Sequence, residues 1–313
     1  MISKGSDEGW VPQRIFNIGG VEVGGRIGEL PTVLIGCIFY DRHRIVKDPK
    51  RGVFERGAAE RLVQRQAELS EATGNPHMVD VIASTPEAMR RYIDFVADLT
   101  EAPLLIDSSI PEVRIAGLEH AAEVGLLERT VYNSLSYATT EEELSRIREA
   151  GLKNAVILAF NPRYLWPRGV VPFLRGEKYG PSPLRRAMEQ GGLERVLIDV
   201  GVLDVPSIGL TMESVERVKR ELGLPAGAGP SNAVLDWRQV RRLGPRAKEV
   251  CLPGSILLTQ CAGADFAIYG PMKYAETVFP AVAMADAILA YRAMRHGVRP
   301  RTKRHPLYRL PFH

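Results

Sequence analysis

Cysteine and histidine are scarce in this chain of 313 residues, which contains three of the former and six of the latter. Cys37, Cys251 and Cys261 form no C-x-x-C pair, and an odd number cannot complete a framework of disulfides. A structural zinc site needs four Cys or His ligands at short spacings, which are also lacking. We therefore expect isolated thiols in a reducing cytoplasm and no metal site.

Long apolar runs are lacking as well. The best candidate, at residues 278–285, contains Pro280 and stops at Asp286, so it is shorter than the roughly 18 residues that a membrane span needs. The N-terminus has Asp7 and Glu8 where a secretory signal would place its apolar run. Both absences predict a cytoplasmic protein.

The charge of the chain is nearly balanced, with 41 Lys and Arg against 37 Asp and Glu. Seven basic residues and no acidic residue fall in residues 292–313, so 34 basic residues face 37 acidic ones in the rest of the chain. Because that body is slightly acidic, we expect no nucleic-acid partner. The basic tail is either a solvated end or an arm that docks an acidic partner or an anionic membrane surface.

Short apolar runs rich in β-branched residues alternate with amphipathic segments along most of the chain, which predicts repeated βα units. Near-continuous apolar strands are typical of parallel strands that are buried on both faces. Eight such units predict a closed (β/α)₈ TIM barrel over residues 31–292, although an open doubly wound sheet has the same local pattern. The expected strands are Val33–Phe39, Met78–Ala83, Pro103–Ile106, Arg129–Tyr132, Ala155–Phe160, Arg195–Ile198, Leu224–Ala228 and Asp265–Tyr269.

Helix signals fall between these strands. Hydroxyl caps and first-turn prolines predict helix starts at Thr85-Pro86, at Ser182-Pro183 and at a capping box from Thr140 to Glu143. Apolar residues at helical spacing predict which faces lean on the sheet. These residues are Ile115, Leu118, Ala122 and Leu126 in one helix, and Val215, Val218 and Leu222 in another.

Both ends of the chain depart from the βα pattern. Residues 16–25 predict a hairpin with a glycine turn, within an N-terminal extension at residues 1–30 that closes one end of the barrel. Its glycines are no dinucleotide fingerprint, because no buried strand precedes them and no helix follows. From about Gly297, prolines and basic residues predict an irregular tail within residues 293–313.

Polar residues follow directly after five of the expected strands. In a parallel barrel these positions share one rim, where active sites form. Carboxylates and amides without a central histidine suit a neutral heterocycle with several N–H donors and acceptors, such as the amino-pyrimidinone edge of a pterin. The candidates are Asp107, Asn133, Asn161, Asp199 and Asn232.

Several longer segments of the chain form a recognisable set, namely PTVLIGCIFY (31–40), ATGNP (72–76), PLLIDSS (103–109), VYNSLS (131–136), VILAFNP (156–162), VLIDVG (196–201), GPSNA (229–233) and YGPMKYAETVFPAVAMADAILA (269–290). Together they resemble the H subunit of tetrahydromethanopterin S-methyltransferase and its stand-alone relatives, over roughly residues 14–292. More distantly, the chain resembles methyltetrahydrofolate:corrinoid methyltransferases and dihydropteroate synthase, which share a pterin-binding TIM barrel.

The resemblance implies that a methyl group moves between N5 of a methyl-tetrahydropterin and the cobalt of a corrinoid. The pterin-binding positions of the family fall on Asp107, Asn133, Asp199 and Asn232, and Asn161 is a neighbouring rim residue. We expect Asn232 to contact N5, and Asp199 to join it as a catalytic residue that holds the ring. N5 is a poor leaving group until it is protonated or strongly hydrogen-bonded, so this contact matters for the rate.

The corrinoid is expected on a partner protein. The D-x-H-x-x-G signature of corrinoid proteins begins at Asp41 and His43, but Val46 stands where the glycine is needed. His43 itself is expected to be a solvated loop histidine. The relatives also imply a homodimer, and association with a membrane methyltransferase complex is a further possibility for proteins of this type.

Other functions remain open at this point. A dihydropteroate synthase needs cationic groups after the last strand, commonly S-x-R-x-H, where this chain has residues 269–273, YGPMK. A non-catalytic subunit that docks a corrinoid methyltransferase complex is the alternative from another class. The choice between tetrahydromethanopterin and tetrahydrofolate is open as well, because Ser231 occupies the position of a histidine in the methanogen protein.

Overall fold

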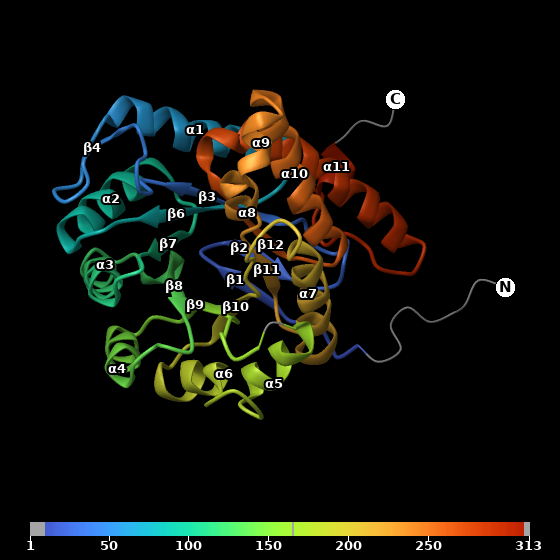
Figure 1. Cartoon of the computed structure of the whole chain (residues 1–313), viewed down its shortest axis with the longest axis horizontal. Coiled ribbons are helices and arrows are strands. Elements are labelled where there is room, and N and C mark those ends of the chain that lie inside the picture. The colour runs from blue at the N-terminus through green and yellow to red at the C-terminus, as the bar shows by residue number, and fades with distance from the viewer. Residues whose placement is uncertain (1–9, 165, 310–313) are drawn as a thin grey trace.

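The computed structural model describes residues 10–164 and 166–309, and Figure 1 shows a ring of helices around a central sheet. Asp7 and Glu8 lie outside the described residues, as do the ends of the proposed terminal segments at residues 1–9 and 310–313. What is described forms a barrel with an N-terminal hairpin and a C-terminal tail. Its outer helices run from α1 to α11 in chain order (Figure 1).

The central sheet is a closed barrel of eight parallel strands, so the (β/α)₈ TIM barrel is confirmed. Each strand pairs with the next one along the chain, and the pairing of Ala267 on the last strand with Leu34 on the first closes the ring. The open-sheet alternative is wrong. The strands are β3 (Val33–Ile38), β6 (His77–Ile82), β7 (Leu104–Asp107), β8 (Thr130–Leu135), β9 (Asn154–Leu158), β10 (Arg195–Asp199), β11 (Ala226–Ala228) and β12 (Phe266–Pro271).

Apolar side chains fill the barrel interior and the space between strands and helices, as continuous apolar runs require. All six residues of β3 are buried. The interior is packed by one side chain from most strands, so it is a core rather than a channel. These side chains include Ile35, Met78, Leu105, Val131, Val156, Leu197 and Phe266.

Helices follow the strands in the expected order. They are α1 (Arg56–Thr73), α2 (Pro86–Leu99), α3 (Pro111–Glu123), α4 (Glu141–Ala150), α5 (Val170–Arg175), α6 (Pro183–Arg185), α7 (Ile208–Leu222), α8 (Ser231–Asp236), α9 (Arg238–Arg242), α10 (Pro245–Cys261), α11 (Ala275–Met294) and α12 (Pro306–Arg309). A small antiparallel pair, β4 (Val46–Asp48) and β5 (Val53–Phe54), lies in the loop after β3.

The predicted helix starts are confirmed, with one correction. Thr85 accepts a hydrogen bond from the amide of Ala88, and Ser182 accepts one from Arg185. Thr140 caps α4 by accepting from the Glu143 amide. The reciprocal half of that capping box is wrong, because the buried Glu143 carboxylate instead binds Arg114 and Tyr132, as described below.

The buried face of α7 is as predicted, whereas that of α3 is rotated. Val215 and Val218 are fully buried. In α3 only Leu118 of the predicted set is fully buried, and the helix also buries Val113, Ala116 and Gly117. The α carbon of Gly117 lies so close to Ile106 and Met89 that a β carbon would clash at 2.7 Å. A glycine therefore decides which face of α3 packs, and apolar spacing alone cannot show this.

The N-terminal hairpin closes the amino-terminal end of the barrel. It consists of β1 (Ile15–Ile18) and β2 (Val21–Gly24), paired antiparallel. Ile18 and Val23 are fully buried against the interior side chains of the barrel. The hairpin thus covers this end of the barrel, as predicted, so a ligand-binding site at this end would be closed to solvent.

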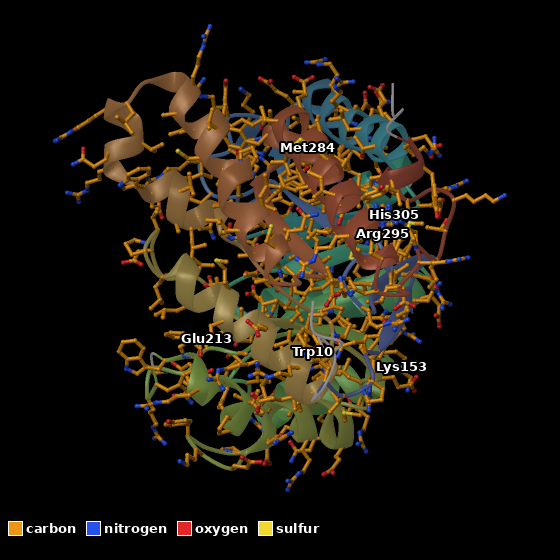
Figure 2. The ribbon with its side chains drawn as sticks, turned by 90° about the vertical axis from the view of Figure 1, so that its right-hand side faces the viewer. Trp10, Lys153, Glu213, Met284, Arg295 and His305 are labelled. Carbon is orange, nitrogen blue, oxygen red and sulfur yellow. The ribbon has the colours of Figure 1, made fainter. Side chains whose placement is uncertain are left out.

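The C-terminal tail packs against the barrel through Val298 and residues 305–307, whereas its basic side chains are exposed, so only part of it fits a solvated end. Leu307 is buried against Ala287 and Ala290 of α11, and His305 is fully buried. The amide of Arg301 donates to the carbonyl of Glu29 at 2.9 Å. Figure 2 looks onto this side and labels Arg295, just after α11, and His305 in the tail.

Residues Met272–Met294 form a helical stretch that is long and apolar enough to cross a membrane, judged by length and composition. This stretch extends beyond the uncharged run at residues 278–285 and includes the charged Asp286. In the fold this stretch contains the last barrel helix, which packs beside α1 and α10. Val278, Phe279 and Val282 are fully buried there, whereas Met284, Ile288 and Tyr291 of the same helix are exposed, so the core explains only part of its apolar character.

Candidate active site at the carboxyl ends of the strands

A cavity of about 590 Å³ opens at the carboxyl ends of the barrel strands. Four of the five predicted rim residues line it, namely Asp107, Asn133, Asp199 and Asn232. They come from β7, β8, β10 and the first turn of α8 (Ser231–Asp236), far apart in the sequence. The barrel therefore assembles one polar site from separate strand ends, which we call the rim cavity.

Asn161 does not line the rim cavity. Its amide nitrogen donates to the carbonyl of Tyr179 at 3.0 Å, and its carbonyl oxygen accepts from the amide of Arg163. Both bonds hold the loop after β9. Both polar atoms of the Asn161 amide thus already have partners within the protein.

Asp199 ends β10 with one oxygen held and the other open toward the cavity. Its Oδ1 accepts a hydrogen bond from the amide of Gly201 at 2.8 Å. Burial raises the pKa of Asp199 to about 6, and the bond from Gly201 opposes that shift. At neutral pH the group is therefore mostly ionised and can accept charge-assisted hydrogen bonds.

Asp80 is a member of the site that the sequence reasoning missed. It lies within β6, is 2% exposed and also lines the rim cavity. The thiol of Cys37 donates to its Oδ2 at 3.0 Å, and the amide nitrogen of Asn133 donates to its Oδ1 at 3.2 Å. The sequence did contain a signal for Asp80, namely an acidic residue inside an apolar strand. Burying a carboxylate costs free energy, so a buried carboxylate usually has a specific partner or role.

Asp80 and Asp107 form a coupled pair of carboxyl groups. Burial raises the pKa of Asp107 well above its ordinary value, and the negative charge of Asp80 raises it further. Burial also raises the pKa of Asp80 to about 6. Two carboxylates this close share a proton rather than both ionise. The site thus combines Asp199, which accepts hydrogen bonds, with the Asp80–Asp107 pair, whose shared proton can be donated.

The two asparagines complete the polar wall. Because the Asn133 nitrogen is committed to Asp80, its carbonyl oxygen is the atom left to accept from a ligand. Asn232 lies in the first turn of α8 with its side chain exposed in the cavity. No hydrogen bond within residues 10–164 and 166–309 holds the Asn232 amide, so it is free to serve a ligand as donor or acceptor.

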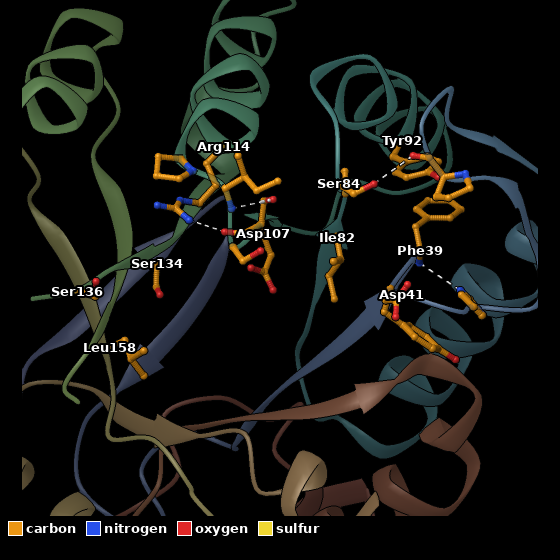
Figure 3. Close-up of a pocket in the computed structure, with 18 of the residues that line it drawn as sticks. Phe39, Asp41, Ile82, Ser84, Tyr92, Asp107, Arg114, Ser134, Ser136 and Leu158 are labelled. Carbon is orange, nitrogen blue, oxygen red and sulfur yellow. Dashed lines mark hydrogen bonds between the residues drawn. The ribbon is translucent and has the colours of Figure 1, made fainter. Parts of the chain in front are cut away.

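A second cavity of about 830 Å³ adjoins the rim cavity and is shown in Figure 3. We call it the side cavity. It lies over the loops after β3, β6, β7 and β8, and it shares lining residues with the rim cavity. The shared residues are Tyr40, Asp41, Ile82, Asp107, Ser134 and Leu158.

His43 lines the side cavity and is not a solvated loop histidine, which corrects the prediction. It is only 8% exposed and stacks on Tyr40, with ring centroids 4.2 Å apart. Its Nδ1 accepts from the amide of Phe39 at 3.2 Å. Burial, followed by the charge of Lys273, lowers its pKa to about 4, so the ring is neutral at pH 7.

A buried ion pair forms part of the same wall. The Arg114 guanidinium donates to Oε1 of Glu143 at 2.6 Å and to the carbonyl of Ser108. The hydroxyl of Tyr132 donates to the same Glu143 oxygen at 2.5 Å. Glu143, expected as a helix cap, instead positions Arg114 beside the cavity.

A metal centre is not indicated in the part of the chain that the structure describes. No group of three or more His, Cys, Asp or Glu residues lies there in an arrangement that could hold a metal ion. Cys37, which lines the rim cavity, is bonded to Asp80 instead. Burial, together with the charge of Asp80, raises the pKa of the Cys37 thiol well above its ordinary value, so it remains protonated.

Comparison with known sequences identifies the family. Residues 12–301 match the family described as tetrahydromethanopterin S-methyltransferase MtrH subunit. The chain belongs to this family. The H subunit of tetrahydromethanopterin S-methyltransferase from Methanothermobacter thermautotrophicus is 39% identical over 310 residues, which cover 95% of this chain and 97% of that protein. The protein of the same name from Methanopyrus kandleri is 37% identical over 309 residues, covering 94% and 96% of the two chains.

Solved structures with a similar fold include dihydropteroate synthases. The enzyme of Yersinia pestis, bound to a pterine-sulfa conjugate, has a TM-score of 0.61 and 14% identity, covering 88% of this chain and 99% of that one. The Xanthomonas albilineans enzyme has a TM-score of 0.58 and 18% identity, covering 91% and 99%. At these identities the likeness shows the shared barrel alone.

Proposed function

We propose that this chain transfers a methyl group between N5 of a methyl-tetrahydropterin and the cobalt of a corrinoid bound to a partner protein. The observation that carries the proposal is the rim cavity itself. There the carboxylate of Asp199, the carboxyl group of Asp107, which shares a proton with Asp80, and the amides of Asn133 and Asn232 converge from four elements. Membership of a methyltransferase family supports the same reaction.

The rim cavity has the donors and acceptors that the pterin edge requires. The amino-pyrimidinone ring presents an amino group and a ring N–H, which a carboxylate such as Asp199 accepts together. The ring also presents acceptor atoms, and the proton that Asp80 and Asp107 share supplies a donor. The Asn133 carbonyl accepts one further N–H. Asn161 is outside this ligand set and acts by holding the loop after β9.

Asn232 is proposed as the residue that acts on N5. The electron pair of Co(I) forms the new bond to the methyl carbon, and the pair of the breaking C–N bond stays on nitrogen. Protonation of N5 before transfer makes it a neutral leaving amine, and the Asn232 amide oxygen can accept a hydrogen bond from that N–H. Catalysis then consists of positioning and of favouring charge at N5, with no covalent enzyme intermediate.

The relatives guide the choice of pterin and partner. Their names refer to tetrahydromethanopterin and to a subunit, so we propose tetrahydromethanopterin rather than tetrahydrofolate and a corrinoid protein within a larger complex. Ser231 does not line the rim cavity, since its hydroxyl donates to the Ile268 carbonyl. A homodimer, a cytoplasmic location and peripheral contact with a membrane complex complete the proposal.

An anaerobic assay tests the reaction directly. The purified chain is mixed with cob(I)alamin and with methyl-tetrahydromethanopterin or methyl-tetrahydrofolate, and the Co(I) absorbance is followed. We expect Co(I) to disappear and methylcobalamin to form, with the Asp199→Asn variant inactive. If calorimetry shows pterin binding without turnover, the corrinoid must be presented on its own protein. If no pterin binds, the proposal fails and a non-catalytic docking subunit takes its place.

A further inference from the structure

The most exposed apolar side chains at the barrel mouth gather on one half of it. Val250 and Leu243 are 71% and 68% exposed, and Trp166 and Leu203 are 61% and 60% exposed. They belong to the segments that follow β9, β10 and β11, which are neighbouring strands of the barrel. The side cavity lies over the loops after β3, β6, β7 and β8, so these side chains lie on the other half of the mouth. Exposed apolar side chains that gather on one surface mark contact sites.

Leu243 and Val250 lie in a strongly basic segment. It consists of residues 238–250, which comprise α9 and the first turns of α10 next to α8, and we call it the α9 corner (Figure 1). The α9 corner contains five basic residues and one acidic residue, although the chain outside residues 292–313 is slightly acidic. Arg238, Arg242 and Arg246 are exposed, and they form no ion pair with any residue that the structure describes. The α9 corner thus presents unmatched positive charge around apolar side chains.

These exposed residues adjoin the rim cavity. Asn232 and Asp236 of α8 line that cavity, and α9 begins two residues after Asp236. On the neighbouring strand, Gly201 lines both the rim cavity and a small cavity that is also lined by Trp166 and Leu203. We call these two residues and the α9 corner together the docking face. A partner that covers the docking face therefore lies beside the mouth of the rim cavity, where the proposed transfer takes place.

The charge of the docking face selects its partner. Unmatched cations are stabilised by an acidic surface and repel a basic one, and exposed apolar side chains need apolar groups to cover them. A second copy of this chain would place the same patch against itself across a two-fold axis, so arginines would face arginines. A nucleic acid stacks its bases on aromatic side chains, and residues 238–250 contain none. An acidic protein surface with apolar side chains meets both requirements.

We infer that the docking face binds the partner protein that carries the corrinoid, and that this partner meets it with an acidic surface around apolar side chains. The inference rests on the proposed function and adds the surface that receives the partner and the charge of the partner's surface. Charges at the edge of such a contact speed the encounter, and apolar side chains at its centre hold the complex together. Free cob(I)alamin needs neither contribution, so it serves as the reference acceptor.

The test compares two kinds of methyl acceptor under anaerobic conditions. One is free cob(I)alamin, and the other is each corrinoid protein purified from the source cells by its corrinoid absorbance and reduced to Co(I). The charge variant is Arg242→Glu combined with Arg246→Glu, and the apolar variant is Leu243→Ser. Arg299→Glu combined with Lys303→Glu in the tail is the matched control, because these residues are also exposed and the change in net charge is the same.

We expect the salt dependence to reveal the docking face. Between about 50 and 500 mM salt, kcat/KM for one corrinoid protein should fall about tenfold in the wild type, because salt screens attraction between exposed charges. At the lower salt concentration the charge variant should lower this kcat/KM about tenfold and lose most of the salt dependence. Leu243→Ser should raise KM for the corrinoid protein and retain the salt dependence. The tail control should behave as the wild type with both acceptors.

Every variant should methylate free cob(I)alamin at the wild-type rate, which shows that its fold and its rim cavity are intact. The inference is overturned if no purified corrinoid protein accepts the methyl group although free cob(I)alamin does, or if the charge variant serves the corrinoid protein as well as the wild type. Conversion of a dimer to a monomer in sedimentation, with transfer unchanged, would assign the docking face to a second copy. Loss of retention on immobilised DNA, with transfer unchanged, would assign it to a nucleic acid.

The two acceptors separate this inference from the proposed function. If neither form of Co(I) is methylated, the proposed function fails first. If both forms are methylated and the charge variant matches the wild type with each, only the docking inference fails. If protein-bound Co(I) alone reacts, calorimetric binding of the methyl-tetrahydropterin replaces free cob(I)alamin as the measure of an intact site, and the comparison of kcat/KM decides as before.

Discussion

The two ends of the barrel bury carboxylates in opposite ways. At the amino-terminal end, Asp286 accepts hydrogen bonds from the amide and hydroxyl of Thr32, each at 3.0 Å, and from Asn75 at 2.6 Å. Asp265 binds the ammonium of Lys219 at 2.5 Å and the amide of Ala226 at 2.9 Å. These acids have partners on several elements and fasten them together.

At the carboxyl-terminal end Asp199 and Asp107 lack such partners. Asp199 has a single bond from the Gly201 amide, and Asp107 faces Asp80, another acid. The pKa of both Asp286 and Asp199 is raised to about 6, mainly by burial, so burial alone does not distinguish the ends. The difference lies in unfilled hydrogen-bonding capacity, which stabilises the fold at one end and remains available to a ligand at the other.

The largest effect should come from breaking a fully partnered carboxylate. Asp265→Ala leaves the buried ammonium of Lys219 without its counter-charge, so we expect the free energy of unfolding to fall by about 3–5 kcal/mol. Urea titration measures this. Asp98→Ala on the exposed face of α2 is the control, and we expect a change within about 0.5 kcal/mol. A loss below about 1 kcal/mol for Asp265→Ala would show that the amino-terminal end does not depend on its ion pair.

At the carboxyl-terminal end, the Asp199→Asn substitution should weaken pterin binding without lowering the free energy of unfolding. Asp199→Asn replaces a charged acceptor of two N–H groups, and at about 1.5–3 kcal/mol per charge-assisted bond the pterin affinity should fall by more than about a hundredfold. The unliganded chain should be at least as stable as wild type at pH 7.5. Calorimetry and urea titration measure the two quantities. A marked loss of stability would place Asp199 with the structural acids.

The pH dependence sharpens the same comparison. The pKa of Asp199 is raised from 3.8 to about 6 in the fold, so the folded chain holds this proton more tightly than the unfolded chain. Its stabilising contribution is present below pH 4 and is lost as pH rises to about 6, by about 2–3 kcal/mol. Pterin binding requires the ionised form and should weaken as pH falls through 6.

Comparing wild type with Asp199→Asn isolates this contribution from the other acids. The difference in unfolding free energy between the two proteins should change over pH 4–6 and be flat above pH 7. A difference that stays constant across the whole range would mean that Asp199 titrates normally, and the proposed distinction between donor and acceptor carboxyls would fail.

The smallest effect on activity is expected at Asn232, which we compare with Asn161 because the two side chains differ in their hydrogen bonds. Asn232→Ala should lower kcat by about tenfold while changing pterin affinity less, because its contact with N5 strengthens only as the methyl group leaves. Asn161→Ala should change neither directly, since both polar atoms of its amide bond the loop backbone. Stopped-flow traces at saturating pterin give kcat. Equal losses of kcat and affinity in Asn232→Ala would contradict the role at N5.

Much of this architecture could be read from the sequence, because it depends on local periodicity. Each of the eight apolar runs became a strand, within a few residues of its predicted bounds. Polar residues directly after these runs, such as Asp107 and Asp199, were placed at the rim because the carboxyl ends of parallel strands meet there. The hairpin was likewise visible from its glycine turn.

The errors occurred where a side chain has a distant partner. Glu143 looked like a capping residue, yet it binds Arg114, 29 positions away in the sequence. His43 looked like a solvated loop residue but is stacked and buried. A solvated end was one of the two interpretations of the tail, but Leu307 packs on α11. No local pattern records such contacts, because they depend on which elements the closed barrel brings together.

The sequence by itself thus determined the strands, the helices and the set of polar residues that one rim must share, since these follow from periodicity and from the common direction of the strands. Only the tertiary structure decided which of those residues keep free hydrogen-bonding capacity. The side-chain amide of Asn161 is hydrogen-bonded to a neighbouring loop. Asp80, from within a strand, interacts with Asp107, and the side cavity opens beside Asp107. Hydrogen-bond partners and cavity walls come from distant segments, so only packing settles them.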